Sequence, residues 1–168
     1  MVHGDIKPQN VLVFKDATGK TTIKVADFGY STLAAGETRK VLLPKSTPWN
    51  APEHHFGEFS VPEAKKTDVY SFGMLCLWVL FASMPRPPNV TQFTFDISTG
   101  PHTSLEDFKG NNKLEEIASQ LIESVPLARM NAGRRLSLNE FFSLTVPLNP
   151  EKRTSDLGKL IVLLCPER

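Results

Sequence analysis

The sequence has little of several features that would place a chain outside the ordinary globular class. It holds two cysteines in 168 residues, Cys76 and Cys165, and both lie in apolar runs. We expect two buried free thiols rather than a disulfide, which favours a reducing intracellular compartment, the cytoplasm. The formal net charge is +1, so the composition gives no electrostatic reason to expect a nucleic acid or a membrane surface as a partner.

Long hydrophobic runs are also scarce. The longest, Val69 to Met84, falls short of the roughly 20 residues that a helix needs to span a bilayer, so we interpret it as a core helix. Polar and charged residues follow Met1 at once, which speaks against a signal peptide. Hydrophobic residues make up 40% of the chain and charged residues 22%, the composition of one soluble globular domain.

The first third of the chain predicts a small β-hairpin and a long loop. Residues 10–14 and 21–26 are β-rich runs, separated by a polar stretch that carries a glycine. A two-stranded hairpin is not stable alone in water, so we expect it to rest on helices. Residues 27–64 show no sustained periodicity and are interpreted as a long ordered loop.

The rest of the chain predicts helices. The strongest runs over residues 65–84, with Thr67 or Asp68 as the expected N-cap, and it is apolar nearly all round. Residues 85–112 are rich in proline, glycine, threonine and asparagine and predict an irregular insert. The fold class is therefore mainly α with a small β-hairpin. Three further helices are expected at residues 112–124, at residues 136–144, and up to residue 164 from a start at Thr154 or Ser155.

Four polar residues near the start of the chain suit phosphoryl transfer, which needs charges on the phosphates and an acceptor for a hydroxyl proton. Asp5 is suited to accept or orient that proton, and Lys7 to neutralise the transferring group. Asn10 and Asp27 offer hard oxygen ligands, the type that Mg²⁺ prefers. Taken singly, Asp5 and Asn10 could be ordinary turn formers, and residues 27–29 could be an ordinary turn that ends a strand.

Four motifs occur in a fixed order: HGDIKPQN at 3–10, ADFG at 26–29, APE at 51–53 and DVYSFG at 68–73. Together they resemble the C-terminal lobe of a eukaryotic-type protein kinase. The resemblance implies a catalytic loop at 3–10, an activation segment at 27–53 and a helical subdomain at 65–165. It also implies ATP and Mg²⁺ as cofactors, with Asp5 as the base, Lys7 at the γ-phosphate, and Asn10 and Asp27 on the metal.

The resemblance also implies structural roles for other motif residues. Glu53 is expected to pair with Arg153 and so tie the activation segment to the helical base. Asp68 is expected to accept backbone N–H groups from the turn at His3, which makes that histidine a scaffold residue. His54 and its neighbour His55 cannot share one helix face as metal ligands, and we expect both on the exposed surface.

The kind of phosphotransferase follows from the residue two positions after Asp5. Small-molecule kinases of the aminoglycoside and choline type share HGD followed by asparagine, but they commonly carry histidine there and lack APE. This chain has Lys7, which resembles the serine/threonine branch of the protein kinases, whereas Trp49 resembles the tyrosine kinases. We give Lys7 more weight because it would contact the reacting phosphate.

Two departures from the family pattern concern the activation segment. Gly4 stands where an arginine usually holds a phosphate of the activation loop, so the sequence does not favour activation by loop phosphorylation. Ser46 stands five residues before Ala51, where serine/threonine kinases usually carry threonine. Its hydroxyl is expected to contact Asp5 and Lys7.

The 168 residues contain no GxGxxG loop, no VAIK-type lysine and no adenine-binding hinge. We therefore expect a C-terminal lobe lacking the N-terminal lobe, with apolar surface left open on the central helix. In the complete domain it would transfer the γ-phosphoryl group of ATP to a serine or threonine hydroxyl of a protein substrate, and the isolated chain is expected to be inactive. The alternative is a non-catalytic, pseudokinase-like module that docks a partner protein.

Overall fold

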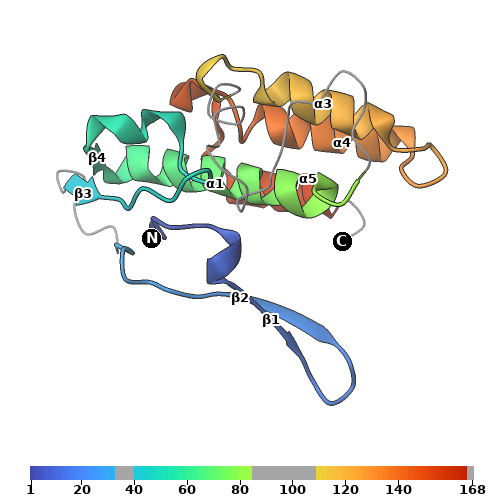
Figure 1. Ribbon diagram of the computed structural model, residues 1–168, viewed down its shortest axis with the longest axis horizontal. Coiled ribbons are helices and arrows are strands. Elements are labelled where there is room, and N and C mark those ends of the chain that lie inside the picture. Colours follow the sequence, from blue (N-terminus) through green and yellow to red (C-terminus); the bar gives the residue numbers. More distant parts are fainter. Residues whose placement is uncertain (33–39, 85–108, 166–168) are drawn as a thin grey trace.

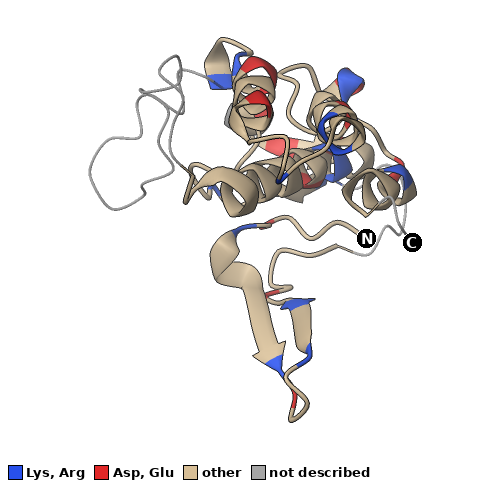
Figure 2. Cartoon of the chain, turned by 90° about the vertical axis from the view of Figure 1, so that its right-hand side faces the viewer, with Lys and Arg blue, Asp and Glu red and all other residues tan. Residues whose placement is uncertain are grey.

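The computed structural model describes residues 1–32, 40–84 and 109–165 of the chain (Figure 1). The described helices form one body, and the β1–β2 hairpin extends away from it (Figures 1 and 2). The expectation of a mainly helical chain with a small hairpin is confirmed, while residues 85–108 of the expected insert lie outside the described part. The elements are β1 (Val11–Lys15), β2 (Thr21–Val25), β3 (Lys40–Leu42), β4 (Glu58–Ser60), α1 (Val61–Phe81), α3 (Leu114–Ser124), α4 (Ala132–Ser143) and α5 (Leu157–Leu164), with short 3-10 turns at Pro8–Asn10, Pro52–Phe56 and Pro150–Lys152.

Helix α1 begins earlier than the sequence predicted, and the expected N-caps at Thr67 and Asp68 are wrong. Ser60 is the N-cap: its hydroxyl accepts the backbone N–H of Glu63, whose carboxylate accepts the backbone N–H of Ser60. This reciprocal pair satisfies two otherwise free donors. Pro62 fits the first turn because it needs no hydrogen bond there. Thr67 instead lies inside the helix, where its hydroxyl donates to the Ala64 carbonyl.

The hydrophobic core forms where α1 packs against α3 and α4. Tyr70, Met74 and Leu77 of α1 and Phe141 of α4 are fully buried. Each such side chain contributes about 1.5–3 kcal/mol when it leaves water. Gly73 marks the closest approach, because a Cβ at this position would lie 2.6–2.9 Å from atoms of the 145–146 segment that follows α4. Glycine at position 73 therefore lets α1 pack closely against this segment.

Two arginines at the start of α4 hold the ends of its neighbours. Arg135 donates to the carbonyls of Glu123 and Val125 at the end of α3. Arg134 donates to the carbonyls of Leu163 and Leu164 at the end of α5. The last carbonyls of a helix lack intrahelical partners, so these contacts stabilise both helix ends.

The three later helices are confirmed, with shifted starts. Helix α3 begins two positions later than expected, at Leu114. Helix α4 begins at Ala132 rather than at 136, since Asn131 accepts the backbone N–H of Arg134 as N-cap. Helix α5 begins at Leu157, and its N-cap is Asp156 rather than Thr154 or Ser155. For α4 and α5 the side chain that accepts a free N–H sets the boundary, whereas α3 begins without a side-chain cap.

The hairpin forms as expected, with Val11 opposite Val25 and Lys15 opposite Thr21. The expectation that it rests on helices is wrong for the described residues. Both strands are exposed along almost their whole length (Figure 2). The hairpin carries apolar side chains on both faces, and the helices reach only its base. Its exposed apolar residues are Leu12, Val13, Phe14, Ile23 and Val25.

The interpretation of 27–64 as a long loop is wrong in part. Strands β3 and β4 pair antiparallel, with Lys40 opposite Ser60 and Leu42 opposite Glu58. Strands of three residues are too short to show an alternating pattern. They border a second, smaller core, separate from the main one, whose buried members are Val2, Val41, Phe59, Val61 and Ala64.

Both cysteines are free, but the expectation that both are buried is wrong. Cys76 is half-buried on α1, and burial raises the pKa of its thiol to about 12. Cys165, at the end of α5, is exposed. Among the described helices, none is both long and apolar enough to cross a membrane.

Candidate functional site

Asp5, Lys7 and Ser46 form a closed triangle of polar contacts. The Lys7 Nζ lies 2.7 Å from the Asp5 Oδ2, and the Ser46 hydroxyl donates to the Asp5 Oδ1 at 2.6 Å. Lys7 in turn donates to the Ser46 Oγ at 3.0 Å. The sequence-based expectation that Ser46 contacts both residues is therefore confirmed. The triangle joins the loop at 3–10 to a residue 41 positions away from Asp5.

The environment of Asp5 favours its ionised form. Burial acts to raise the pKa of this carboxyl group, but the hydrogen bonds from Lys7 and Ser46 and the charge of Lys7 outweigh burial, so the pKa lies below its ordinary value of 3.8. Asn10 adds a further donor through its Nδ2, 3.2 Å from the Asp5 Oδ2. At neutral pH the group is a carboxylate, which can accept or orient a proton.

Asn10 is held close to Asp5 by a second contact. Its Nδ2 also donates to the Asp5 backbone carbonyl at 2.8 Å, and the Asn10 side chain is buried. The amide nitrogen therefore holds the Asn10 side chain against Asp5. The amide Oδ1 accepts no hydrogen bond from the described residues, so it is available to a ligand.

A backbone hydrogen bond places Asp27 at the same end of the hairpin as Asn10. The Ala26 N–H donates to the Asn10 carbonyl at 2.8 Å, so Asp27 follows directly where the two loops meet. Asp27 has a left-handed φ of 62°, is exposed, and accepts the Gly29 N–H with one oxygen. Among the described residues its side chain makes no direct contact with Asp5, Lys7 or Asn10.

The donor set fits a magnesium ion better than a transition metal. Asn10 and Asp27 each present an oxygen without a hydrogen-bond donor, and Mg²⁺ is held by few protein oxygens together with water and phosphate. In the described ranges no three His, Cys, Asp or Glu side chains gather as a metal cluster. These two side chains thus fit the kind of oxygen donor that Mg²⁺ takes.

Asp68 holds the loop in place from α1. Its two oxygens accept the backbone N–H groups of His3 at 2.6 Å and Gly4 at 2.8 Å, as expected. Burial raises the pKa of Asp68 above its ordinary value despite these donors. Gly4 has a φ of 85°, and a Cβ there would lie 3.0 Å from Leu43, so this turn requires glycine.

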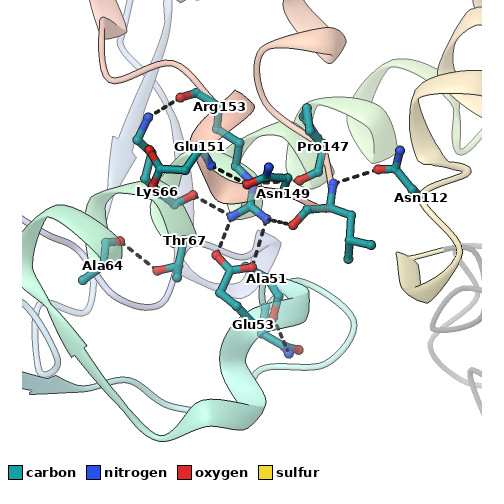
Figure 3. Close-up of polar contacts among 12 residues, drawn as sticks. Ala51, Glu53, Ala64, Lys66, Thr67, Asn112, Pro147, Asn149, Glu151 and Arg153 are labelled. Atoms are coloured by element: carbon teal, nitrogen blue, oxygen red, sulfur yellow. Dashed lines mark hydrogen bonds and ion pairs between the residues drawn. The ribbon is translucent and has the colours of Figure 1, made fainter.

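Glu53 and Arg153 form the expected ion pair, with N–O distances of 2.5 and 2.9 Å (Figure 3). The Arg153 guanidinium is buried and also donates to the carbonyls of Pro147, Leu148 and Lys66. Every nitrogen of the guanidinium thus donates to an acceptor, which lowers the cost of burying its charge. The pair ties the end of the activation segment to the turn before α5.

Comparison with known proteins identifies the family of this chain. A family model described as "Protein kinase domain" matches residues 1–146. The chain belongs to the protein kinase family.

Curated relatives of this kinase chain come from several kingdoms. It is 28% identical over 141 residues to "Serine/threonine-protein kinase A" of Synechocystis sp., a match that covers 83% of the chain and 26% of that protein. It is 43% identical over 88 residues to "Serine/threonine-protein kinase CTR1" of Arabidopsis thaliana, covering 52% of the chain and 10% of that protein. To "Dual specificity protein kinase shkD" of Dictyostelium discoideum it is 38% identical over 86 residues, covering 51% of the chain and 11% of that protein. The chain therefore spans about a quarter or less of the length of these relatives.

The burial of one histidine of this kinase chain was missed by sequence reasoning. His54, expected on the surface, is buried next to Glu53, whereas the side chain of His55 lies outside the described part. The His54 Nε2 is 3.2 Å from the Leu43 carbonyl, and the ring packs against Phe59. Its Nδ1 is buried without a hydrogen-bond partner among the described residues. Two adjacent histidines carry no periodicity from which this burial could be read.

We expect His54 to make the kinase less stable at mildly acidic pH. Burial lowers the pKa of His54 below its ordinary value of 6.5, with Glu53 opposing and Lys109 reinforcing the shift. The unfolded chain therefore binds a proton at a higher pH than the folded chain, so stability is lost as the pH falls from about 6.5 toward the folded pKa. The loss approaches about 1.4 kcal/mol per pH unit. Urea denaturation at pH 7, 6 and 5 measures it.

The matched variants for this measurement are His54→Gln and His55→Gln. His54→Gln removes the titrating ring, so its free energy of unfolding should change less between pH 7 and 5 than that of the wild type. His55→Gln should keep the wild-type slope. Equal slopes in the wild type and in His54→Gln would contradict the expectation.

Proposed function

We propose that this chain is the C-terminal lobe of a protein kinase domain that, when complete, transfers the γ-phosphoryl group of ATP to a serine or threonine hydroxyl of a protein. The observation that carries the proposal is the triangle of Asp5, Lys7 and Ser46. It supplies an ionised acceptor beside a cation, the pair that phosphoryl transfer requires. The names of two matched relatives also contain "serine/threonine-protein kinase".

Each residue of the site has a separate task in this proposal. Asp5 orients the substrate hydroxyl and accepts its proton, and Lys7 offsets the negative charge of the transferring phosphoryl group. Ser46 holds the Asp5 and Lys7 side chains in position relative to each other. Asn10 and Asp27 would hold Mg²⁺, which neutralises charge on the nucleotide phosphates when bound.

The isolated chain should have little or no activity. The 168 residues contain no glycine-rich loop and no strand lysine to hold the α- and β-phosphates, and no hinge to bury the adenine. Burying an adenine ring removes on the order of 100 Å² of apolar surface from water, worth roughly 2.5 kcal/mol, or about 60-fold in affinity. The residues on the γ-phosphate side alone do not supply the affinity that adenine burial would add.

Calorimetric titration with Mg·ATP tests the proposal. The chain should bind roughly 100-fold more weakly than a chimera in which the N-terminal lobe of a matched relative precedes Met1. In the chimera, Asp27→Asn should weaken binding and remove its dependence on Mg²⁺, because an amide lacks the charge that attracts the ion. The control is Glu151→Gln, a change at an exposed carboxylate with no contact to Asp5, Lys7, Asn10 or Asp27, which should leave binding unchanged. A chimera that binds ATP equally well with and without Mg²⁺ would count against the proposal.

A groove beside the site favours a second candidate, a non-catalytic docking module. The groove has a volume of about 840 Å³ and lies between α1, α5 and the N-terminal segment. Its lining is largely apolar, and open apolar surface of this kind marks a binding site. Failure of the chimera to bind Mg·ATP would favour this function. Its apolar lining residues include Ile6, Val69, Phe72, Leu157, Leu160 and Ile161.

A further inference from the structure

Lys109 is a buried lysine that contacts the activation segment. Its side chain has 2% exposure, and its Nζ donates to the Pro48 carbonyl at 3.2 Å, across 61 positions of sequence. A buried ammonium group costs several kcal/mol unless its donors find partners, so a lysine at this position indicates that the contact matters. None of the kinase motifs in the sequence includes it.

The residues around Pro48 form one compact turn, from Ser46 to Asn50. The backbone N–H groups of Trp49 and Asn50 both donate to the Ser46 carbonyl, at 2.7 and 3.1 Å. Trp49 is buried, and its ring packs edge-on against Trp78 of α1 at 6.0 Å. Because the turn is hydrogen-bonded within itself, fixing the Pro48 carbonyl also fixes Ser46 at its start.

Ser46 is the residue through which this turn reaches the catalytic loop. Its hydroxyl donates to Asp5 and accepts from Lys7. A chain of direct contacts therefore runs from Lys109 through the turn to the triangle. Both ends of this chain are buried or half-buried, which shields the contacts from water.

Tyr70 links this contact to the ion pair at the other end of the segment. The Lys109 Nζ lies 5.9 Å from the centroid of the Tyr70 ring, and the Arg153 guanidinium lies 4.7 Å from the same centroid. Arg153 binds Glu53. Two cations that share one aromatic ring thus hold Pro48 and Glu53, the two ends of the stretch that follows Ser46.

We propose that Lys109 is a positioning residue: through the Pro48 carbonyl it holds the Ser46–Asn50 turn so that the Ser46 hydroxyl stays against Asp5 and Lys7. This inference deepens the proposed function and rests on it for the effect on phosphoryl transfer. The anchoring itself is a property of the fold and can be measured without activity.

Amide hydrogen exchange tests the anchoring in the full chain. Lys109→Met keeps the apolar stem but removes the donor, so the Trp49 and Asn50 amides should exchange about tenfold faster, as expected for loss of one charge-assisted hydrogen bond. Lys109→Arg restores a donor and should return both rates to within threefold of the wild type. Lys113→Met, at a nearby exposed lysine, should leave them unchanged. Amides inside α4 should be unaffected in all three variants.

Three results would overturn the anchoring role: unchanged Trp49 and Asn50 rates in Lys109→Met, equal acceleration in Lys113→Met, or no restoration by arginine. Where Lys109→Met also accelerates the α4 amides, the whole fold is weakened, and Lys109→Gln, whose shorter side chain does not reach Pro48, becomes the deciding variant. Faster turn amides with unchanged α4 amides in that variant support the proposal, and any other pattern overturns it.

The chimera described above tests the effect on the reaction. Lys109→Met should raise the KM for the protein substrate about tenfold and leave the KM for ATP within twofold, because in the proposed function the turn positions Asp5, which orients the substrate hydroxyl, and contacts neither proposed metal ligand. An equal rise in both constants would overturn the positioning role. A wild-type chimera that transfers no phosphate would instead refute the proposed function, while the exchange rates would still decide whether Lys109 anchors the turn.

Discussion

Glu53→Gln should lower the free energy of unfolding by about 3 kcal/mol, the largest stability effect that we expect from a single polar substitution in this kinase chain. The substitution keeps the shape of the side chain but removes its charge. Arg153 is 1% exposed, so its positive charge would remain in the interior without a counter-ion. Its bonds to three backbone carbonyls and its contact with Tyr70 retain part of the stabilisation, which keeps the loss at the lower end of the range for broken buried pairs.

The matched control is the ion pair of Glu123 and Arg135, whose closest N–O distance is also 2.5 Å. Its carboxylate side chain is 62% exposed, so Glu123→Gln should cost less than about 1 kcal/mol. Urea denaturation of the three proteins, followed by circular dichroism, measures both losses. Similar losses in the two variants, or a loss below about 1 kcal/mol for Glu53→Gln, would show that burial does not set the strength of this contact.

Asp5→Asn should lower the kcat of the chimera by about 10²–10⁴, the range for loss of a general acid–base group. An amide has the shape of the carboxylate but cannot take up the proton of the substrate hydroxyl. The substitution also removes the ion pair with Lys7, which would then be less well placed over the phosphoryl group. Initial rates at saturating ATP and saturating protein substrate give the change in kcat.

Calorimetric binding of Mg·ATP to the same variant separates chemistry from folding. Asp5 is not one of the proposed metal ligands, so the affinity should stay within about threefold of the wild-type value, a change of about 0.65 kcal/mol. Ser46→Ala should give a smaller loss of kcat because it removes two hydrogen bonds, with Asp5 and Lys7, but no charge. A variant at Asp5 that keeps full kcat would remove the basis for the proposed mechanism.

The contacts that the sequence predicted best join motif residues of complementary chemistry. Glu53 and Arg153 carry opposite charges, and Asp68 is an acceptor facing two backbone donors. Such pairs can be proposed from residue type once a family resemblance gives their order along the chain. The contact of Ser46 with Asp5 was expected on the same basis. The placement of Asp27 near the loop of Asn10 rests on the hairpin, which two β-rich runs and a polar stretch between them also indicated.

Where sequence reasoning failed, two local signals competed or none existed. Asp68 resembles a helix cap, but its oxygens serve the loop at His3, and Ser60 with Glu63 supplies the cap instead. Burial of His54 depends on packing against Phe59 of β4, a strand too short to predict. The contact of Lys109 with Pro48 joins residues that share no motif. Tertiary contacts of this kind leave no pattern along the chain.

The pairing of Glu53 with Arg153 has a consequence for synthesis of the chain. The arginine comes 100 residues after the glutamate, so a ribosome adding about 5–20 residues per second produces it roughly 5–20 seconds later. During that interval the activation segment has no anchor at its Glu53 end, and the apolar face of α1 stays uncovered until α4 has been made. The nascent chain would therefore expose this surface to chaperones until α4 has emerged.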